Sequence, residues 1–279
     1  MDRIYLIGNG YVCDFITAKF SSKYDFVGVC RSKKVNCHHN YSIDISNDNG
    51  MLNDIIDING YVVYLAPPQN TGLKDLVLSK FLTAIQKNKV KKIIYISTSG
   101  VYGDQNDALV NEDKKISPIT DRANRRANAE EQIKDSGIKY TILRVPGIYG
   151  KGRLPLKRIN ERLPLIKIEL CRHTNLINSK DLANLIMQTL LNSSTDNITM
   201  NVSDGTPIKT TEYYLHIYDE LNIRYPEFID YDQADKVYDE KRKSFINESR
   251  ILDVSLMHKI FPDIIKFKNI RDGIRDSLS

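Results

Sequence analysis

The chain has 279 residues, a length that suits one large α/β domain with a smaller lobe. Its 40 basic and 35 acidic residues give a formal net charge of +5, and no dense basic run indicates a nucleic-acid partner. No apolar run approaches the length of a membrane span, and the four cysteines show no paired spacing, so we expect a cytoplasmic protein without disulfide bonds.

The first part of the chain alternates short apolar strands with amphipathic helices, which is typical of a parallel sheet covered on both faces. Ile4–Ile7 is a predicted buried strand, and the turn Gly8–Gly10 leads into a helix that starts near Tyr11. Three more strands are predicted at Phe26–Cys30, Tyr41–Ile45 and Tyr61–Ala66, the last ended by Pro67-Pro68.

The same alternation continues toward the middle of the chain. A helix is expected from about Thr71 to Asn88, followed by the buried strand Ile93–Ser99, a helix from about Asp121 to Ser136 and the strand Tyr140–Arg144. Because strands and helices alternate throughout, the sequence predicts a Rossmann-type, doubly wound parallel sheet.

Beyond Gly150 the pattern loosens, and we expect a smaller C-terminal lobe there. The predicted elements are a helix at Leu154–Leu163 ended by Pro164, a helix at Lys180–Leu191, a strand at Thr199–Val202 and a helix at Thr210–Leu221.

The segment Gly8–Cys13 follows a strand and opens a helix, as a dinucleotide-binding loop requires. Gly8 permits the tight turn, and Gly10 lets the backbone approach a pyrophosphate that the helix amino terminus attracts. Cys13 replaces the third glycine of the motif and is small enough for close packing of helix on strand. We therefore expect Gly8, Asn9, Gly10, Tyr11 and Val12 to contact a dinucleotide.

The end of the second strand indicates which dinucleotide is bound. An acidic residue there would bind the ribose hydroxyls of NAD, whereas this chain has Cys30-Arg31-Ser32-Lys33-Lys34. A guanidinium can form bidentate hydrogen bonds with a 2′-phosphate, so Arg31 favours NADP(H) over NAD. The alternative is that Arg31 points into solvent, in which case NAD remains open.

The run Cys37-His38-His39 does not predict a metal site. Adjacent side chains on an extended segment point to opposite faces, and no second pair of ligands follows at the spacing of a tetrahedral site.

The segment Tyr95-Ile-Ser-Thr-Ser-Gly-Val-Tyr-Gly-Asp104 resembles the active-site strand of the extended short-chain dehydrogenases, the nucleotide-sugar epimerase and dehydratase group. Leu143–Arg153, Asn175–Ala183 and Thr199–Gly205 resemble further segments of these enzymes. The resemblance covers nearly the whole chain. It is specific for the superfamily, but it does not identify the sugar, the direction of reaction or the partner.

The resemblance implies further ligand contacts. Asp44 and Ile45 would lie beside the adenine, Leu65, Ala66 and Pro67 would pass the cofactor, and Pro146, Gly147 and Ile148 would meet the nicotinamide. Tyr149, Arg153 and Asn178 would contact the substrate, a nucleotide-activated sugar. It also implies a NAD(P)-binding domain at 1–150, with about 171–203 returning to the sheet, and a substrate lobe at about 151–170 and 204–279. Members of the family often form homodimers.

The catalytic residues are where the resemblance fails. In the family a Ser or Thr, a Tyr and a Lys four residues later carry the chemistry, and the matching positions here are Thr98, Arg122 and Arg126. Arg126 could still donate hydrogen bonds to a ribose. Arg122 cannot replace a phenol, because a guanidinium stays protonated in proteins. Tyr102 and Tyr149 are substitute candidates, although a structural or substrate-lining role suits each better.

Three hypotheses follow from this departure. The chain is an oxidoreductase or epimerase whose proton is handled by Tyr102 or water, or it is a catalytically silent dinucleotide sensor or regulatory subunit. A third hypothesis makes Arg122 and Arg126 an anion clamp for lyase or isomerase chemistry. A solvated helix face remains the alternative for these two arginines.

Overall fold

The computed structural model describes residues 2–32, 36–48, 50–56, 59–85, 90–246 and 248–279, and its chain divides into two compact units. The first unit comprises Met1–Val101, Pro118–Arg144 and Leu182–Met200, and the second comprises Tyr102–Ser117, Val145–Asp181 and Asn201–Ser279. The domain boundaries and the substrate-binding lobe expected from the sequence stay predictions.

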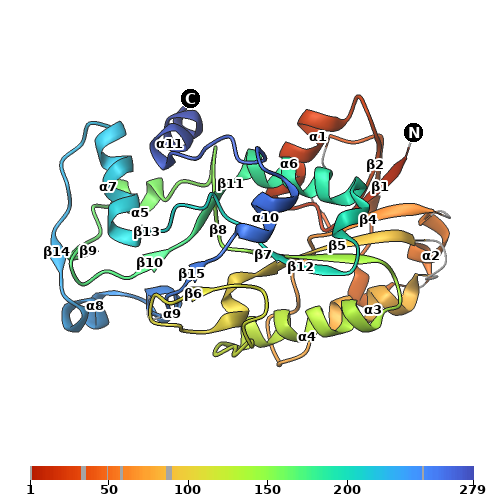
Figure 1. Ribbon diagram of the computed structural model, residues 1–279, viewed down its shortest axis with the longest axis horizontal. Coiled ribbons are helices and arrows are strands. Elements are labelled where there is room, and N and C mark those ends of the chain that lie inside the picture. The colour runs from red at the N-terminus through yellow and green to blue at the C-terminus, as the bar shows by residue number, and fades with distance from the viewer. Residues whose placement is uncertain (1, 33–35, 49, 57–58, 86–89, 247) are drawn as a thin grey trace. The chain divides into compact units, whose positions relative to one another are not determined.

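A seven-stranded sheet forms the centre of the first unit (Figure 1). Its strands are β1 (Arg3–Ile7), β2 (Asp25–Cys30), β3 (His39–Ser42), β4 (Gly60–Tyr64), β5 (Val90–Thr98), β7 (Tyr140–Val145) and β12 (Ile198–Asn201). Their order is β12-β7-β5-β4-β1-β2-β3, and β1 pairs in parallel with both β2 and β4. The chain thus runs outward from β1 to β3 and then returns to β4, which confirms the doubly wound prediction and places a topological switch point beside β1.

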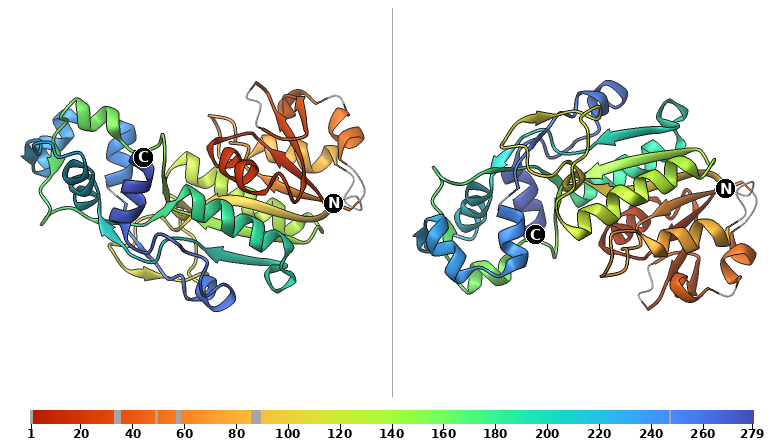
Figure 2. Two further views of the ribbon diagram at one scale, coloured as in Figure 1. Left: turned by 90° about the horizontal axis from the view of Figure 1, so that it is seen from above. Right: turned by 90° about the horizontal axis from the view of Figure 1, so that it is seen from below.

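Helices cover both faces of this sheet (Figure 2). On one face lie α1 (Tyr11–Phe20) and α6 (Ser179–Leu191), joined by a hydrogen bond of 3.0 Å from Lys19 Nζ to Asn184 Oδ1. On the other face lie α2 (Met51–Ile55), α3 (Leu76–Ala84) and α4 (Asp121–Asp135). The one-turn helices η1 (Ile45–Asn47) and η4 (Ser193–Thr195) complete the unit.

The core of the first unit explains why these segments fold as strands. Tyr64 on β4 and Tyr95 on β5 are completely buried, and Phe81 of α3 packs on Tyr64 with ring centroids 5.1 Å apart. Ile133 of α4 joins the same cluster. Because both faces of the strands are covered, they are continuous apolar runs rather than alternating ones.

Two elements of the first unit differ from the sequence prediction. Helix α3 begins at Leu76 instead of about Thr71, because Gly72 adopts φ +80° and the Asp75 carboxylate caps the helix at the N–H of Leu78. Strand β3 ends at Ser42 instead of Ile45, because Asp44 caps η1. Lys33 and Lys34, and the predicted end of the third helix at Asn88, lie outside the described residues.

The second unit contains short elements. They are β6 (Leu109–Val110), β8 (Gly147–Tyr149), α5 (Leu156–Asn160), β9 (Leu165–Ile166), β10 (His173–Thr174), β11 (Leu176–Asn178), β13 (Ile208–Lys209), α7 (Thr210–Glu220), β14 (Phe228–Ile229), α8 (Tyr231–Val237), α9 (Glu240–Ile246), β15 (Ile251–Leu252), α10 (Ser255–Ile260) and α11 (Ile270–Leu278). The one-turn helix η3 (Ser99–Tyr102) lies where the chain passes from the first unit to the second.

Small two-stranded pairings and one helix pair hold this unit together. Strands β8 and β11, β6 and β15, and β9 and β14 pair in parallel, and β10 pairs antiparallel with β13. Helices α7 and α11 pack on each other over a core that includes Tyr149, Tyr213 and Ile217. Helix α5 is shorter than the predicted Leu154–Leu163, because Arg162 at φ +51° ends it before Pro164. Within the described ranges, no helix is both long and apolar enough to cross a membrane.

Candidate dinucleotide site

A cavity of about 450 Å³ opens in the first unit where β1, β2 and β4 end. Its volume lies within the usual range of small-molecule pockets. The residues that line it come from the end of β2, from the segments that follow β1, β2, β3 and β4, and from η1 and α3: Gly8, Asn9, Gly10, Val29, Cys30, Arg31, Ser32, Ile43, Asp44, Ile45, Ser46, Leu65, Ala66, Pro67, Pro68, Gln69, Asn70 and Val77. Ligands of open α/β sheets bind at this edge, beside the switch point.

The glycine loop has the backbone geometry that the sequence predicts. Gly8 adopts φ +89°, and a Cβ there would come within 2.5 Å of the Cα of Ala66, so β1 and β4 can close on each other only if residue 8 is glycine. Cys13 is buried in α1, and its Sγ donates to the carbonyl oxygen of Gly8 at 3.6 Å. The residue that replaces the third glycine therefore holds the turn closed.

Helix α1 begins at this loop with Gly10 as its N-cap, and no side chain caps it. Tyr11 and Val12 are its first two residues, and neither side chain lines the cavity. An anion in the cavity would meet backbone N–H groups of this first turn, because a helix amino terminus attracts negative charge. The loop and the helix thus fit a dinucleotide diphosphate.

Asn9 turns its amide toward the floor of the loop. Its Nδ2 donates to Asn40 Oδ1 at 3.5 Å, and a Cβ on Gly28 would come within 2.8 Å of both amide side chains. Glycine at position 28 therefore leaves room for the Asn9–Asn40 contact beneath the pocket.

The wall beyond β2 is basic and polar. Arg31 and Ser32 line the cavity and are exposed, and the carbonyl oxygen of Arg31 accepts a hydrogen bond of 2.8 Å from Ser42 Oγ. Asp44 is the one carboxylate among the described residues of the lining, and its oxygens accept hydrogen bonds from Ser46 N at 3.0 Å and Asn47 Nδ2 at 3.3 Å. That carboxylate is therefore used in capping η1.

Part of this lining could not be predicted from the sequence. Gln69 and Asn70 lie in the loop after Pro67-Pro68, and Val77 lies on α3. Their position after the end of a buried strand was the available signal, whereas the path of the loop back toward the pocket depends on contacts distant in sequence.

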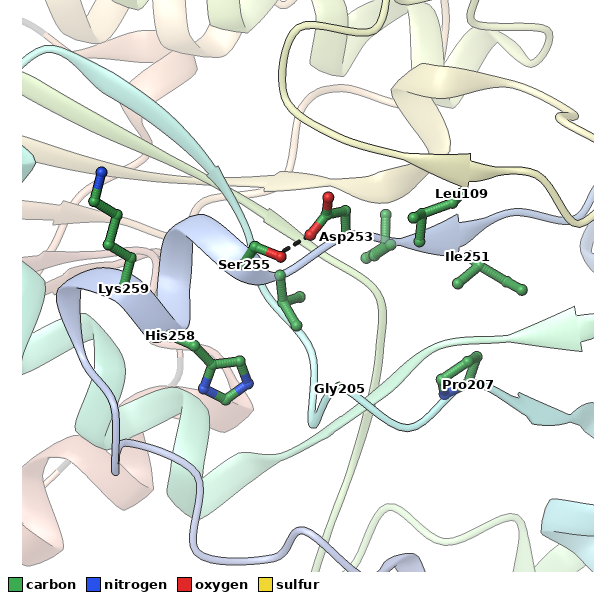
Figure 3. A pocket seen from close by; sticks show the side chains of 10 residues that line it. Leu109, Gly205, Pro207, Ile251, Asp253, Ser255, His258 and Lys259 are labelled. Atoms are coloured by element: carbon green, nitrogen blue, oxygen red, sulfur yellow. Dashed lines mark hydrogen bonds between the residues drawn. The ribbon is translucent and has the colours of Figure 1, made fainter.

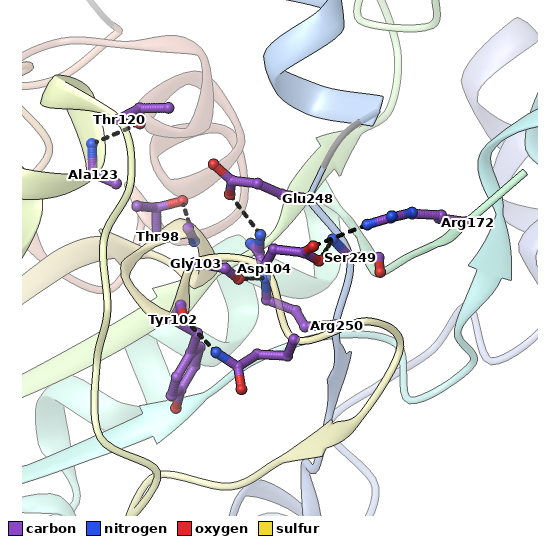
Figure 4. Close-up of polar contacts among 12 residues, drawn as sticks. Thr98, Tyr102, Gly103, Asp104, Thr120, Ala123, Arg172, Glu248, Ser249 and Arg250 are labelled. Atoms are coloured by element: carbon purple, nitrogen blue, oxygen red, sulfur yellow. Dashed lines mark hydrogen bonds and ion pairs between the residues drawn. The ribbon is translucent and has the colours of Figure 1, made fainter. Parts of the chain in front are cut away.

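The end of β5 and the start of α4 come together within the first unit (Figure 4). Thr98 Oγ1 accepts a hydrogen bond of 3.2 Å from the N–H of Gly100, and a Cβ on Gly100 would lie 4.0 Å from the Cβ of Ala123. Arg122, the residue before Ala123, is exposed. The structure therefore brings the end of β5 near the helical turn that carries Arg122, and a catalytic role for Thr98 and Arg122 stays a prediction.

Arg126, one turn further along α4, points into the protein. Its Nη1 donates to the hydroxyl of Tyr95 at 3.0 Å and to the carbonyl oxygen of Ile96 at 3.3 Å. Burial opposes its charge, but Tyr95 and Asp75 favour it, and the net effect raises the pKa of Arg126. Burial in turn raises the pKa of Tyr95 to about 12. Arg126 is therefore not part of a solvated helix face.

In the second unit, Tyr102 is completely buried. Its hydroxyl donates to Asn201 Oδ1 at 2.8 Å, and the carbonyl oxygen of Asn111 is a second acceptor for the same proton at 3.1 Å. Asn201 in turn donates to the carbonyl oxygens of Val110 and Asp253. This geometry favours a structural role for Tyr102 over acid–base catalysis.

Of the other residues predicted to contact the substrate in the second unit, Tyr149 and Asn178 are packed locally. Tyr149 is buried with its hydroxyl above Gly273, where a Cβ would come within 2.1 Å of it, and burial raises the Tyr149 pKa well above its usual value. Asn178 is buried and its Oδ1 accepts from the N–H of Lys180. Arg153 is exposed. Substrate contact by these residues stays a prediction.

Pro146 precedes β8, and Gly147 and Ile148 belong to it, in register with Leu176 and Ile177 of β11. A Cβ on Gly147 would come within 2.9 Å of Leu176, so close packing of these two strands accounts for the glycine. All three residues lie in the second unit, and their contact with a nicotinamide stays a prediction.

A charged cluster that sequence analysis missed follows Gly103 in the second unit (Figure 4). Asp104 Oδ2 accepts from Arg172 Nη1 at 3.0 Å and Oδ1 accepts from the N–H of Ser249, while Arg250 donates to Gly103 O and pairs with Glu248 at 2.7 Å. Each arginine has a carboxylate partner, so the cluster holds distant segments of this unit together.

The second unit also has a hollow of about 580 Å³ beside α10 (Figure 3). Its floor is mostly apolar, including Leu109 and Ile251. Asp253 accepts from the N–H of Ser255 at 2.8 Å, and His258 lies over Gly205. Across the described part of both units, no group of three or more His, Cys, Asp or Glu side chains could hold a metal ion.

Comparison with known proteins shows the family and the fold of the chain. A family model described as NAD(P)H-binding matches residues 46–193, which is just over half of the chain. No curated protein sequence matches at a significant level.

Many solved structures have a similar fold. One is a conserved protein of unknown function from Silicibacter pomeroyi, with TM-score 0.82, 18% identity and coverage of 100% of this chain and 98% of that one. Another is UDP-glucuronic acid 4-epimerase from Bacillus cereus in complex with NAD, with TM-score 0.77, 18% identity and coverage of 98% and 96%. A third is UDP-N-acetylglucosamine 4-epimerase from Methanobrevibacter ruminantium, with TM-score 0.77, 17% identity and coverage of 99% and 98%. At these identities the likeness shows the fold alone.

Proposed function

The chain belongs to the NAD(P)H-binding family, and from that premise we propose that it is an NADP(H)-binding oxidoreductase or epimerase that acts on a nucleotide-activated sugar. The observation that carries the proposal is the cavity lined by Gly8–Gly10 and Arg31 at the ends of β1 and β2. The sugar nucleotide is suggested by the fold, which is shared with two 4-epimerases of UDP-sugars.

NADP(H) is proposed over NAD because of the charges in the lining. Arg31 supplies a guanidinium beyond β2, and the Asp44 carboxylate is already engaged by Ser46 and Asn47. A 2′-phosphate would meet a positive charge there, whereas the one carboxylate of the described lining already accepts two hydrogen bonds within η1. NAD is the competing cofactor, since the similar epimerase from Bacillus cereus is described with NAD.

The chemistry proposed for this chain's own residues is limited. A nicotinamide cofactor would supply reversible hydride transfer. Thr98 would orient the substrate oxygen, and Arg122 would bind anionic or hydroxyl groups but would not accept a proton. Tyr102 is buried with its hydroxyl engaged, so we assign the proton step to water.

The second candidate function is a catalytically silent dinucleotide sensor or regulatory subunit. The orientation of Arg126 favours it, because the residue in the lysine position donates to Tyr95 and Ile96 inside the first unit. In this function, ligand binding would stabilise one conformation for a protein partner. A homodimer is a further proposal that rests on the family resemblance.

Turnover separates the two functions. The protein is incubated with NADP⁺ or NADPH and a panel of UDP- and dTDP-sugars, and both the absorbance of reduced nicotinamide and the sugar products are followed. Redox change or epimerised sugar supports the enzyme. Cofactor binding without turnover, together with a partner recovered only when cofactor is present, supports the sensor. Arg122→Tyr is the informative variant: restored turnover indicates a decayed dehydrogenase, whereas lost ligand binding indicates an anion clamp.

A further inference from the structure

Helix α4 carries a buried charge that the proposed chemistry does not use. The side chain of Arg125 is 6% exposed, and its Nη1 donates to the carbonyl oxygen of Gly72 at 2.6 Å. Arginine is almost never this buried unless it is paired, so the contact with a loop 53 residues earlier in the chain requires an explanation.

Two more side chains of α4 hold the same loop. Asn128 Oδ1 accepts from the N–H of Asp75 at 3.0 Å, and Gln132 Nε2 donates to the carbonyl oxygen of Asp75 at 3.0 Å. Gln132 also donates to Asn128 Oδ1 at 2.7 Å, as neighbours four residues apart on a helix can do. Both backbone polar groups of Asp75 are therefore held by α4.

The Asp75 carboxylate continues the connection into α3. It is completely buried, and its Oδ1 accepts from the N–H of Leu78 at 2.9 Å, which caps the helix. Burial raises the Asp75 pKa, and the guanidinium groups of Arg126 and Arg125 oppose that rise. The two arginines thus help to keep a charge that fixes the start of α3.

The same loop forms one wall of the dinucleotide cavity. Leu65 and Ala66, which follow β4, line the cavity, as do the first residues of the loop, from Pro67 to Asn70, and Val77 on α3. Gln69 closes the loop on itself, because its Oε1 accepts from the N–H of Leu76 at 3.1 Å and its Nε2 donates to the carbonyl oxygen of Thr71 at 3.1 Å. A continuous set of hydrogen bonds therefore joins α4 to this wall.

We infer that Arg125, Asn128 and Gln132 are positioning residues, which clamp the loop 67–75 so that its wall is preformed for the dinucleotide. The helix that carries a catalytic pair in the resembling enzymes would serve here as a brace for the cofactor pocket. The inference rests on the dinucleotide-binding part of the proposed function. A preformed wall raises affinity because less ordering entropy is lost when the ligand binds.

The test compares Arg125→Ala and Arg125→Lys with Lys134→Ala, which changes an exposed residue of the same helix. Affinity for NADP⁺ is measured by titration calorimetry, and amide hydrogen exchange is followed in residues 69–76 and in β5. We expect Arg125→Ala to weaken binding at least about 10-fold and to speed exchange in the loop but not in β5. Arg125→Lys recovers part of the affinity, since lysine can still donate to Gly72, and Lys134→Ala binds as the unaltered protein does.

Three results overturn the inference. Arg125→Ala that folds and binds NADP⁺ within about twofold of the unaltered protein refutes the clamp while the proposed function stands. Exchange that rises equally in β5 and in the loop reveals a general loss of stability instead of positioning. An unaltered protein that binds no dinucleotide refutes the proposed function, and the positioning role with it. If Arg125→Ala does not fold, Gln132→Ala removes a hydrogen bond of a half-buried side chain, and about threefold weaker binding is then expected.

Discussion

The Nη1 atom of Arg126 lies 3.0 Å from the hydroxyl oxygen of Tyr95, a residue 31 positions earlier in the chain. The guanidinium carbon also lies 5.7 Å from the centroid of the Tyr95 ring. The guanidinium of Arg126 thereby joins α4 to β5 in the middle of the sheet. The position that holds a catalytic lysine in the resembling family is therefore tied to the core of the first unit.

Replacing Arg126 should cost stability. In Arg126→Met the hydroxyl of completely buried Tyr95 loses its donor, and we expect the free energy of unfolding to fall by about 2 kcal/mol. Urea denaturation measures the loss. Lys134→Met is the control on the exposed side of α4 and should change stability by less than about 0.5 kcal/mol. Equal effects of the two replacements would contradict a structural role for Arg126.

The two glycines of the loop should respond differently to alanine. A Cβ at Gly8 would lie 2.5 Å from backbone atoms of Ala66 at φ +89°, so Gly8→Ala should lose several kcal/mol of stability or fail to fold. At Gly10 a Cβ meets only the carbonyl oxygen of Gly8 at 3.9 Å, so Gly10→Ala should keep its melting temperature.

The affinity of Gly10→Ala for a dinucleotide should fall, although its stability is kept. Because Gly10 lines the cavity, a methyl group there should keep the backbone away from a diphosphate and weaken binding about 10-fold or more. Gly10→Ala that binds as tightly as the unaltered protein would show that the ligand does not approach this loop.

Arg31 should decide between the two cofactors. Arg31→Ala removes a charged hydrogen-bond donor, so affinity for NADP⁺ should fall about 10- to 100-fold, while affinity for NAD⁺ should change by less than about threefold. The NADP⁺ preference should also weaken with added salt, because Arg31 is exposed and its charge is screened. Parallel losses for both cofactors would contradict recognition of the 2′-phosphate.

Asp204 should make the stability of the second unit depend on pH. Burial and the nearby charge of Asp181 raise its pKa to about 7, against the hydrogen bond from the N–H of Thr206. The carboxyl is protonated in both states below about pH 3, so it carries no penalty there. As the pH rises to about 7 the unfolded chain ionises first, and stability falls. A tenfold change in proton affinity is about 1.4 kcal/mol, so the full loss is on the order of 4 kcal/mol.

Asp204→Asn tests this pH dependence. The amide oxygen can still accept from Thr206, so the replacement should raise stability much more at pH 8 than at pH 4.5, as measured by urea denaturation. A gain of the same size at both pH values would mean that ionisation of Asp204 is not the cause.

The sequence predicts the elements that depend on local patterns. The apolar runs mark the strands, and the Gly8–Gly10 turn before Tyr11 marks the start of α1. The predicted start of α3 was wrong, because the start depends on Gly72 and on the cap at Asp75, and the partners of these residues lie on α4.

Some residues of the candidate site could likewise be predicted from the sequence, and others could not. Gly8 could be assigned from its position after a strand, and Asp44 and Ala66 from the family resemblance, and all three line the cavity. The inward orientation of Arg126 could not be predicted, because helical spacing gives a side chain's face but not its partner on β5. The same holds for Arg125, whose partner Gly72 is 53 residues away.

The central claim is that the cavity beside the Gly8–Gly10 loop binds a pyridine dinucleotide, and titration calorimetry with NADP⁺ and NAD⁺ at fixed ionic strength tests it most directly. The account predicts saturable binding of one dinucleotide per chain, tighter for NADP⁺ than for NAD⁺. Absence of measurable binding of either cofactor, at concentrations well above those usual for such proteins, would contradict it.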